Sequence, residues 1–265
     1  MAEPGLAGPM RPFVIAHISD LHCGSPHFVP SLMERAIVEV NDLAPDVVVC
    51  SGDLTTFGYR QEYLQARAYL DRLDCPELIV VPGNHDSRNV GYVHFEELFG
   101  ARQRVLRLRD VCLLAVDSSE PDLDHGLVGR GRYGWIRDEF AEPARLRIFV
   151  LHHHLLPIPG TGRERNVVHD AGDTLEALMA ARCHLVLSGH KHVPHAWRLE
   201  DLFLVNAGTV STLRLRGHGR PCYNIVEVSE DRVAVARKYP FHERERILEF
   251  SLDTFDHRKW PEGES

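Results

Sequence analysis

Short apolar runs alternate with amphipathic stretches through the first third of the chain. The runs at 13–18, 46–50 and 78–81 have the length and composition of buried strands. Between them, apolar residues recur at helical spacing over 31–43, and 61–73 has the same character. Strand, helix and strand in succession indicate parallel strands joined by crossover helices. The pattern therefore predicts a βαβαβ start.

The rest of the chain is richer in strands with short connections. The expected strands and helices lie at 111–116, 133–140 (helix), 147–151, 173–181 (helix), 184–188, 202–206, 222–228 and 232–236. The last two strands are close enough to form a hairpin, whereas 154–172 is a polar loop without clear periodicity. This order predicts an α/β fold of two packed mixed sheets with helices outside.

The 265 residues fit one large α/β domain. We expect a flexible, Gly- and Pro-rich arm at 1–11 and the domain at 12–236. The charged extension, 237–265, has one expected strand at 247–252 and should pack on the domain or on the partner of a homodimer. No apolar run approaches the ~20 residues that span a bilayer, and the start lacks the pattern of a signal peptide. A cytoplasmic location is therefore expected.

Composition narrows the classes of function. The formal net charge of −8 argues against stable nucleic-acid binding, which depends on neutralising phosphates. It does not exclude a nucleotide as a small-molecule substrate, because bound metals can neutralise its charge locally. The six cysteines are scattered and are expected to be free, buried thiols. The unusual figure is the 17 histidines, many of which cluster in short motifs.

Ligand-type side chains follow the ends of successive predicted strands. They are Asp20 and His22 after 13–18, Asp53 after 46–50, Asn84 and His85 after 78–81, His152, His153 and His154 after 147–151, and His190 and His192 after 184–188. Open α/β sheets bind ligands at the carboxyl ends of their strands, so one crevice can collect all of them. Carboxylate and imidazole without thiolate suit manganese, iron, nickel or zinc, and a shared carboxylate can bridge two ions.

Each motif alone is weak evidence for a metal site. Asp-x-His is common, and Gly-Asn-His-Asp more often forms only a turn. All the motifs in this order, each at a strand end, favour the metal interpretation, because chance would have to end every strand with suitable chemistry.

The combined motifs resemble those of the calcineurin-like metallophosphoesterase superfamily, over about 13–228. They are Asp20-Leu21-His22, Gly52-Asp53, Gly83-Asn84-His85-Asp86, His152-His153-His154 and Gly189-His190-Lys191-His192. The resemblance implies a four-layer α/β/β/α sandwich. Within the superfamily, stretches such as Ile18-Ser19-Asp20-Leu21-His22 and Gly52-Asp53-Leu54-Thr55 are most similar to class III cyclic-nucleotide phosphodiesterases.

The resemblance also implies a set of ligands for two divalent ions, Mn²⁺ or Fe, with Zn²⁺ as a further candidate. One ion would be held by Asp20, His22, Asp53 and His192, and the other by Asp53, Asn84, His153 and His190. The family pattern is usually His-His-Pro, with the first histidine as the ligand and the proline two residues after it. Here Leu155 stands where that proline is expected, so His153 is chosen while His152 and His154 remain open.

By the same resemblance, the chain should hydrolyse a small or nucleotide phosphodiester. Hydroxide bridging the two ions would attack phosphorus, with His85, Asp53 and Asn84 as the catalytic residues. His85 would bind the phosphate or protonate the leaving group. The alternatives are a phosphomonoesterase, a hydrolase of a nucleoside-diphosphate lipid, and a non-catalytic metal-binding scaffold. Scaffolds of this fold usually lose several ligands, and no expected ligand is missing here.

Overall fold

Alternate residues of the first strand face two different hydrophobic layers. The computed structural model describes residues 11–162, 166–216 and 219–260. In β1 (Phe13–Ile18), Phe13 and Ile15 pack between the two sheets, whereas Ala16 and Ile18 pack against helices on the other side. A strand buried on both faces reads as a continuous apolar run, which is why its sequence does not alternate.

The first sheet has strand order β13-β12-β11-β10-β1-β2-β3 among the described residues. Its other strands are β2 (Val47–Cys50), β3 (Glu77–Val80), β10 (Tyr223–Val228), β11 (Arg232–Lys238), β12 (Arg244–Ser251) and β13 (His257–Lys259). Strands β1, β2 and β3 are parallel, and β10 to β13 are added antiparallel. The carboxyl ends of β1, β2 and β3 therefore lie at one edge.

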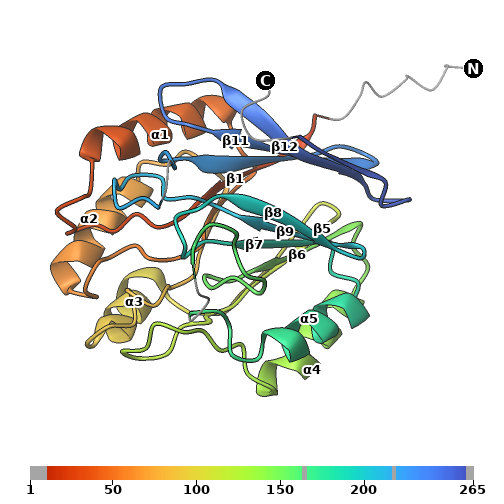
Figure 1. The fold of residues 1–265 in the computed structure, drawn as a ribbon, viewed down its shortest axis with the longest axis horizontal. Helices are drawn as coiled ribbons and strands as arrows, with labels where there is room; N and C mark the ends of the chain where they lie inside the picture. Colours follow the sequence, from red (N-terminus) through yellow and green to blue (C-terminus); the bar gives the residue numbers. More distant parts are fainter. Residues whose placement is uncertain (1–10, 163–165, 217–218, 261–265) are drawn as a thin grey trace, which may run out of the picture.

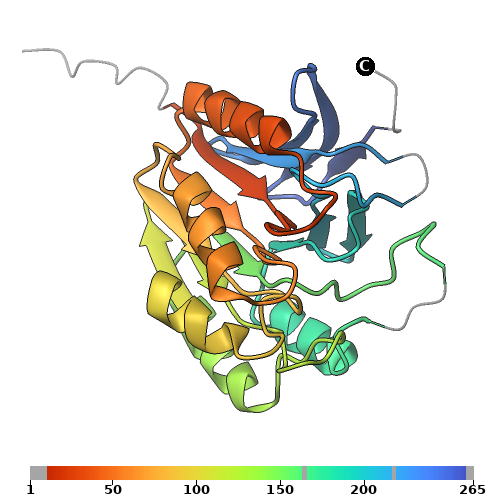
Figure 2. The ribbon, with the colours of Figure 1, turned by 90° about the vertical axis from the view of Figure 1, so that its left-hand side faces the viewer.

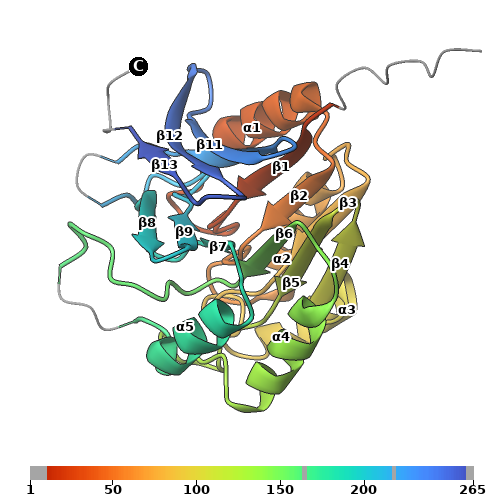
Figure 3. The same cartoon turned by 90° about the vertical axis from the view of Figure 1, so that its right-hand side faces the viewer.

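The second sheet has the order β4-β5-β6-β7-β9-β8 within the same described ranges. Its strands are β4 (Arg104–Leu108), β5 (Val111–Ala115), β6 (Leu146–Val150), β7 (Leu185–Ser188), β8 (His195–Leu199) and β9 (Leu202–Asn206). The four central strands are parallel, and β4 and β8 close the edges antiparallel. Figure 3 shows both sheets with their labels.

Helices cover the outer faces of the two sheets, so the chain has four layers (Figure 1). The helices are α1 (Pro30–Leu43), α2 (Arg60–Leu70), α3 (Gly91–Phe99), α4 (Gly131–Ala141) and α5 (Ala171–Ala180). Helices α1, α2 and α3 lie on the side of the first sheet (Figure 2), and α4 and α5 pack on the second. This is the predicted α/β/β/α sandwich.

Helix α1 shows why these segments are helical. Pro30 stands at its start, where a fixed φ and a missing N–H cost nothing. Met33, Ala36, Ile37 and Val40 then recur at three- and four-residue spacing and form its buried face. The helix is held mainly by this apolar stripe against the sheet.

The core between the sheets is apolar and extends into the C-terminal extension. Phe203 of β9 and Phe250 of β12 stack across it with ring centroids 4.0 Å apart. The extension expected at 237–265 thus contributes β12 and β13 to the first sheet. Of the arm expected at 1–11, residues 1–10 lie outside the described residues.

Four elements escape the sequence pattern. Strands β4 and β8 are edge strands that are mostly only partly buried, and β13 is only three residues long. Helix α3 buries little more than Gly91 and Phe95, too few for a periodic signal. All six cysteines are free thiols, as expected, and Cys75 is the one that is half-buried. Among the described residues no helix combines the length and apolar character needed to cross a membrane.

Candidate metal centre

The predicted ligands come from both sheets and meet where the parallel strands end. Asp20, Asp53 and Asn84 follow β1, β2 and β3 of the first sheet, whereas His152 and His190 follow β6 and β7 of the second. The stacking of the sheets brings these ends together at one edge of the sandwich. Every side chain of the set is buried or nearly so, in a fold whose other aspartates are mostly exposed.

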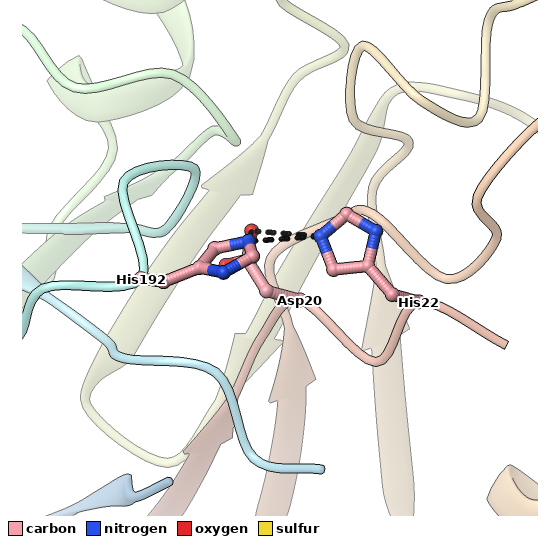
Figure 4. Close-up of side chains that lie close together, drawn as sticks. All are labelled: Asp20, His22 and His192. Atoms are coloured by element: carbon pink, nitrogen blue, oxygen red, sulfur yellow. Dashed lines mark hydrogen bonds and ion pairs between the residues drawn. The ribbon is translucent and has the colours of Figure 1, made fainter. Parts of the chain in front are cut away.

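A first cluster consists of Asp20, His22 and His192 (Figure 4). The Nε2 atoms of His22 and His192 are 2.9 Å apart, and His192 Nε2 lies 3.2 Å from Asp20 Oδ1. His192 donates its Nδ1–H to the carbonyl of Arg214 at 2.6 Å, so its Nε2 presents a lone pair to the cluster. Asp20 Oδ1 is buried and accepts no hydrogen bond from the described residues. These electron-rich atoms fit a cation.

A second cluster consists of Asp53, Asn84, His152 and His190. His152 Nε2 lies 3.4 Å from Asp53 Oδ2 and 3.2 Å from Asn84 Oδ1, and His190 Nδ1 lies 3.0 Å from Asn84 Oδ1. The ring of His152 donates its Nδ1–H to the carbonyl of Ser51 at 2.7 Å, which directs Nε2 at the cluster. Nitrogen and oxygen acceptors again converge on one point.

Asp53 belongs to the second cluster and also approaches His22 of the first. Its Oδ2 atom is 3.6 Å from His22 Nε2 and 3.4 Å from His152 Nε2, while Oδ1 accepts the backbone N–H of His85 at 2.9 Å. The ring of His85 is held by its own Nδ1–H, which is donated to the carbonyl of Thr56 at 2.7 Å. His85 therefore stands beside the shared carboxylate with a fixed ring orientation.

The geometry does not support the choice of His153 as a ligand. His152, the first of the three histidines, occupies that position in the cluster. The Nδ1 atom of His153 lies 2.9 Å from the hydroxyl of Ser118, and its ring packs beneath Gly126. The His153 ring packs against His190, with ring centroids 4.7 Å apart, but its Nδ1 atom is directed at Ser118 and not at Asp53. With His152 as the ligand, the position of the family's proline falls at His154, one residue before Leu155.

The backbone is strained at five of these residues. Asp20, His22, Asp53, His190 and His192 have φ of 55°, 52°, 52°, 77° and 57°, in the left-handed region. For a non-glycine residue this conformation costs about 1–2 kcal/mol. Strain of this kind persists only where the surroundings enforce it, and it gathers at functional sites.

Hydrogen bonds from the next strands enforce the strained turn after β1. The N–H groups of Asp20 and His22 donate to the carbonyls of Gly52 and Asp53, both at 2.9 Å. The hydroxyl of Thr209 donates to the carbonyl of Asp20 at 2.7 Å. Thr209 therefore supports the strained backbone of this turn.

A buried carboxylate that the sequence left without a role connects two of the motifs. Asp86 accepts hydrogen bonds from the N–H groups of Gly83, Leu54 and Thr55 and from the Thr55 hydroxyl, all at 2.8–3.0 Å. Burial and the nearby Asp53 raise the pKa of Asp86 to about 7. Its position in the Gly-Asn-His-Asp motif was the only available signal.

Electrostatics pair Asp53 with His152. Burial alone would raise the pKa of Asp53, but His152 and His85 outweigh it and hold that pKa well below its usual value. Burial alone would lower the pKa of His152, but Asp53 raises it to about 9. Burial does prevail at His22, whose pKa falls to about 3. The proton on His152 thus balances the negative charge of Asp53, and a bound cation can replace that proton.

Comparison with known proteins identifies this arrangement. A family model described as calcineurin-like phosphoesterase matches residues 13–194, which is more than half of the chain. The chain belongs to the calcineurin-like phosphoesterase family. It is a metal-dependent phosphoester hydrolase, and its Asp and His clusters provide the means to bind divalent metal.

Curated relatives of this phosphoesterase include several phosphodiesterases. A probable cyclic nucleotide phosphodiesterase of Synechococcus is 26% identical over 70% of this chain and 76% of its own length. A cAMP/cGMP dual specificity phosphodiesterase of Mycobacterium tuberculosis is 26% identical over 69% of this chain and 63% of its own length. A glycerophosphodiester phosphodiesterase of Enterobacter lignolyticus is 30% identical, over 68% and 70% respectively.

Solved structures confirm the fold of the phosphoesterase. A dimetal phosphatase from Danio rerio matches with a TM-score of 0.69 at 11% identity, covering 89% of this chain and 98% of that one. Purple acid phosphatase PPD1 from yellow lupin matches with a TM-score of 0.67 at 13% identity, covering 94% and 53% respectively.

Proposed function

We propose that this phosphoesterase is a dinuclear-metal phosphodiesterase acting on a small or nucleotide diester. The observation that carries the proposal is the position of Asp53, whose Oδ2 atom lies 3.4–3.6 Å from a ring nitrogen of each cluster. A carboxylate shared in this way is suited to bridging two ions. The preference for diesters is supported by the names of the curated relatives.

The two clusters divide the ligands between two ions. Asp20, His22, Asp53 and His192 would hold one, and Asp53, Asn84, His152 and His190 the other. Bound ions of this type supply Lewis acidity and make hydroxide available at neutral pH. The donor set of carboxylate, amide and imidazole suits manganese, iron or zinc.

The chain itself contributes orientation and a proton carrier. His85 keeps its Nδ1–H on the Thr56 carbonyl, which leaves Nε2 to exchange a proton with substrate. One of its ring nitrogens lies within 4.8 Å of ligand atoms of His22 and Asp53, so a phosphate bound there is within its reach. Protonated His85 would stabilise phosphate oxygens or protonate the departing alkoxide.

A hydrolysis panel on metal-loaded protein tests the proposal. Cyclic AMP, bis(p-nitrophenyl) phosphate and p-nitrophenyl phosphate are compared after loading with Mn²⁺, Fe²⁺ or Zn²⁺. We expect two ions per chain and faster turnover of diesters than of the monoester. Preference for the monoester would refute the diester assignment, and a stoichiometry of one ion would refute the dinuclear centre.

Matched variants test the assignment of ligands. His152→Gln should lose one of the two ions and with it the activity, whereas His153→Gln should keep both ions. The two positions are adjacent and equally buried, so the comparison separates coordination from packing. His85→Ala should retain both ions and lose turnover. If His153→Gln were the variant that lost an ion, the assignment made here would be reversed.

A further inference from the structure

An asparagine can serve as an oxygen ligand only if its amide faces the right way. The two terminal atoms of Asn84 are similar in size, and rotation by half a turn would present the NH₂ group to the second cluster instead of Oδ1. In the structure Oδ1 faces His152 and His190, at 3.2 and 3.0 Å. A specific partner of the NH₂ group must select this orientation.

That partner is Asp124. Asn84 donates from Nδ2 to Asp124 Oδ1 at 3.2 Å. A carboxylate only accepts hydrogen bonds, so the end of the amide that faces Asp124 has to be the NH₂ group. Oδ1 is then directed at the metal ligands. The negative charge on Asp124 also polarises the amide and increases the electron density on its oxygen.

The loop that carries Asp124 is attached to the segment that follows Asn84. The backbone N–H of Asn89 donates to Asp122 Oδ1 at 2.7 Å, and the N–H of Asp122 donates to the carbonyl of Ser87 at 3.2 Å. Arg88 donates to Asp124 Oδ1 at 2.9 Å and fixes the carboxylate itself. The paired residues are 33–36 positions apart in sequence, yet the two segments are held together at three points.

We propose that Asp124 is a positioning residue that orients the Asn84 amide for the second metal ion. The inference rests on the proposed dinuclear function, which it extends beyond the ligands. Among the described residues, the Asp124 carboxylate accepts hydrogen bonds from Asn84 and Arg88, and of these two only Asn84 is a proposed ligand. It therefore acts on one ion only, and the first cluster should not respond to its removal.

The experiment is a calorimetric titration of metal-free protein with Mn²⁺, resolving two binding steps. Asp124→Ala should weaken the Mn²⁺ affinity of the second cluster about 10- to 100-fold, the usual range for groups that orient metal ligands. The affinity of the other binding step should be unchanged. Asp124→Asn should recover most of that loss, because its amide oxygen still accepts from Asn84. At saturating Mn²⁺ the kcat of Asp124→Ala should approach that of the wild type.

Asp122→Ala is the matched control, since it loosens the same loop without touching Asn84. It should bind both ions within a few-fold of the wild type. Equal weakening in Asp122→Ala and Asp124→Ala would show that loop attachment alone is responsible and would overturn the inference. Unchanged titration of Asp124→Ala would overturn it as well while leaving the dinuclear centre intact. If the wild-type protein bound only one ion, the proposed dinuclear function itself would be refuted, whatever the result for Asp124→Ala.

Discussion

Substituting Gly83 by alanine probes how closely the metal-binding turns approach each other. A Cβ atom added at Gly83 would lie 2.2 Å from Asp53 Oδ1 and 2.5 Å from the backbone nitrogen of Asp53. Real Cβ contacts essentially never fall below 3.0 Å, so the Asp53 carboxylate must move by about 0.8 Å and the backbone of its turn by about 0.5 Å. The group that moves is the carboxylate shared by the two clusters.

The cost follows from this displacement. Forcing a methyl group into a packed site costs about 1–3 kcal/mol, which lowers Tm by roughly 2–10 °C for a chain of this length. A displacement approaching 1 Å at reacting groups costs about 100-fold in rate, so Gly83→Ala should lose far more activity than stability. The shift would also lengthen the 2.9 Å hydrogen bond from the N–H of His85 to Asp53.

The assay combines thermal unfolding, metal content and hydrolysis of bis(p-nitrophenyl) phosphate. Gly172→Ala is the matched control, because an added Cβ there meets nothing within 4 Å and the residue lies in helix α5. That change should stabilise the protein by about 0.4–1 kcal/mol and leave activity unchanged. If Gly83→Ala kept the Tm, the metal content and the turnover of the wild type, the close approach of the turns would have no functional meaning.

Three further outcomes are expected. Burial would lower the pKa of His152, but Asp53 raises it to about 9, so Mn²⁺ must displace a proton when it binds. The affinity for Mn²⁺, measured by calorimetry, should therefore rise about tenfold from pH 7 to pH 8. A flat pH profile would contradict this expectation. Burial and Arg147 lower the pKa of His184 from 6.5 to about 4, so the unfolded state binds more protons between these values. Stability should therefore rise with pH over this range, by up to about 1.4 kcal/mol per unit, and the rise should be smaller in His184→Asn when followed by denaturant unfolding. Phe250→Ala removes half of the stack with Phe203 and should cost about 3–5 kcal/mol in urea unfolding, with Mn²⁺ affinity of the folded protein unchanged.

Most of the fold was predictable because strands buried on both faces produce long apolar runs. Strand β1 was recognised to its ends for this reason, and helix α1 nearly to its ends from the helical spacing of its apolar residues. Elements that bury little, such as edge strand β4 and helix α3, carry no comparable signal. Their existence depends on the neighbours they cover, which is information that local sequence does not contain.

The site residues also fall into those that the sequence predicts and those that it does not. Six of the seven predicted metal ligands lie in the clusters, because each belongs to a short motif that follows a buried strand. The choice between His152 and His153 depended on one residue of register, which only the strand end at Val150 and the hydrogen bond to Ser51 decide. Asp124 was not predictable, since its contact with Asn84 arises from the pairing of two loops distant in sequence.

The division of the proposed metal ligands between the two sheets would order the events of folding. Neither the segment through Asn84 nor the segment from His152 onward contains enough donors to complete either half of the centre. High-affinity binding of an ion must await the docking of one sheet on the other, and once bound the ion opposes their separation. Metal uptake is therefore a reporter of late assembly, and chelation should loosen the contact between the layers before it unravels either one.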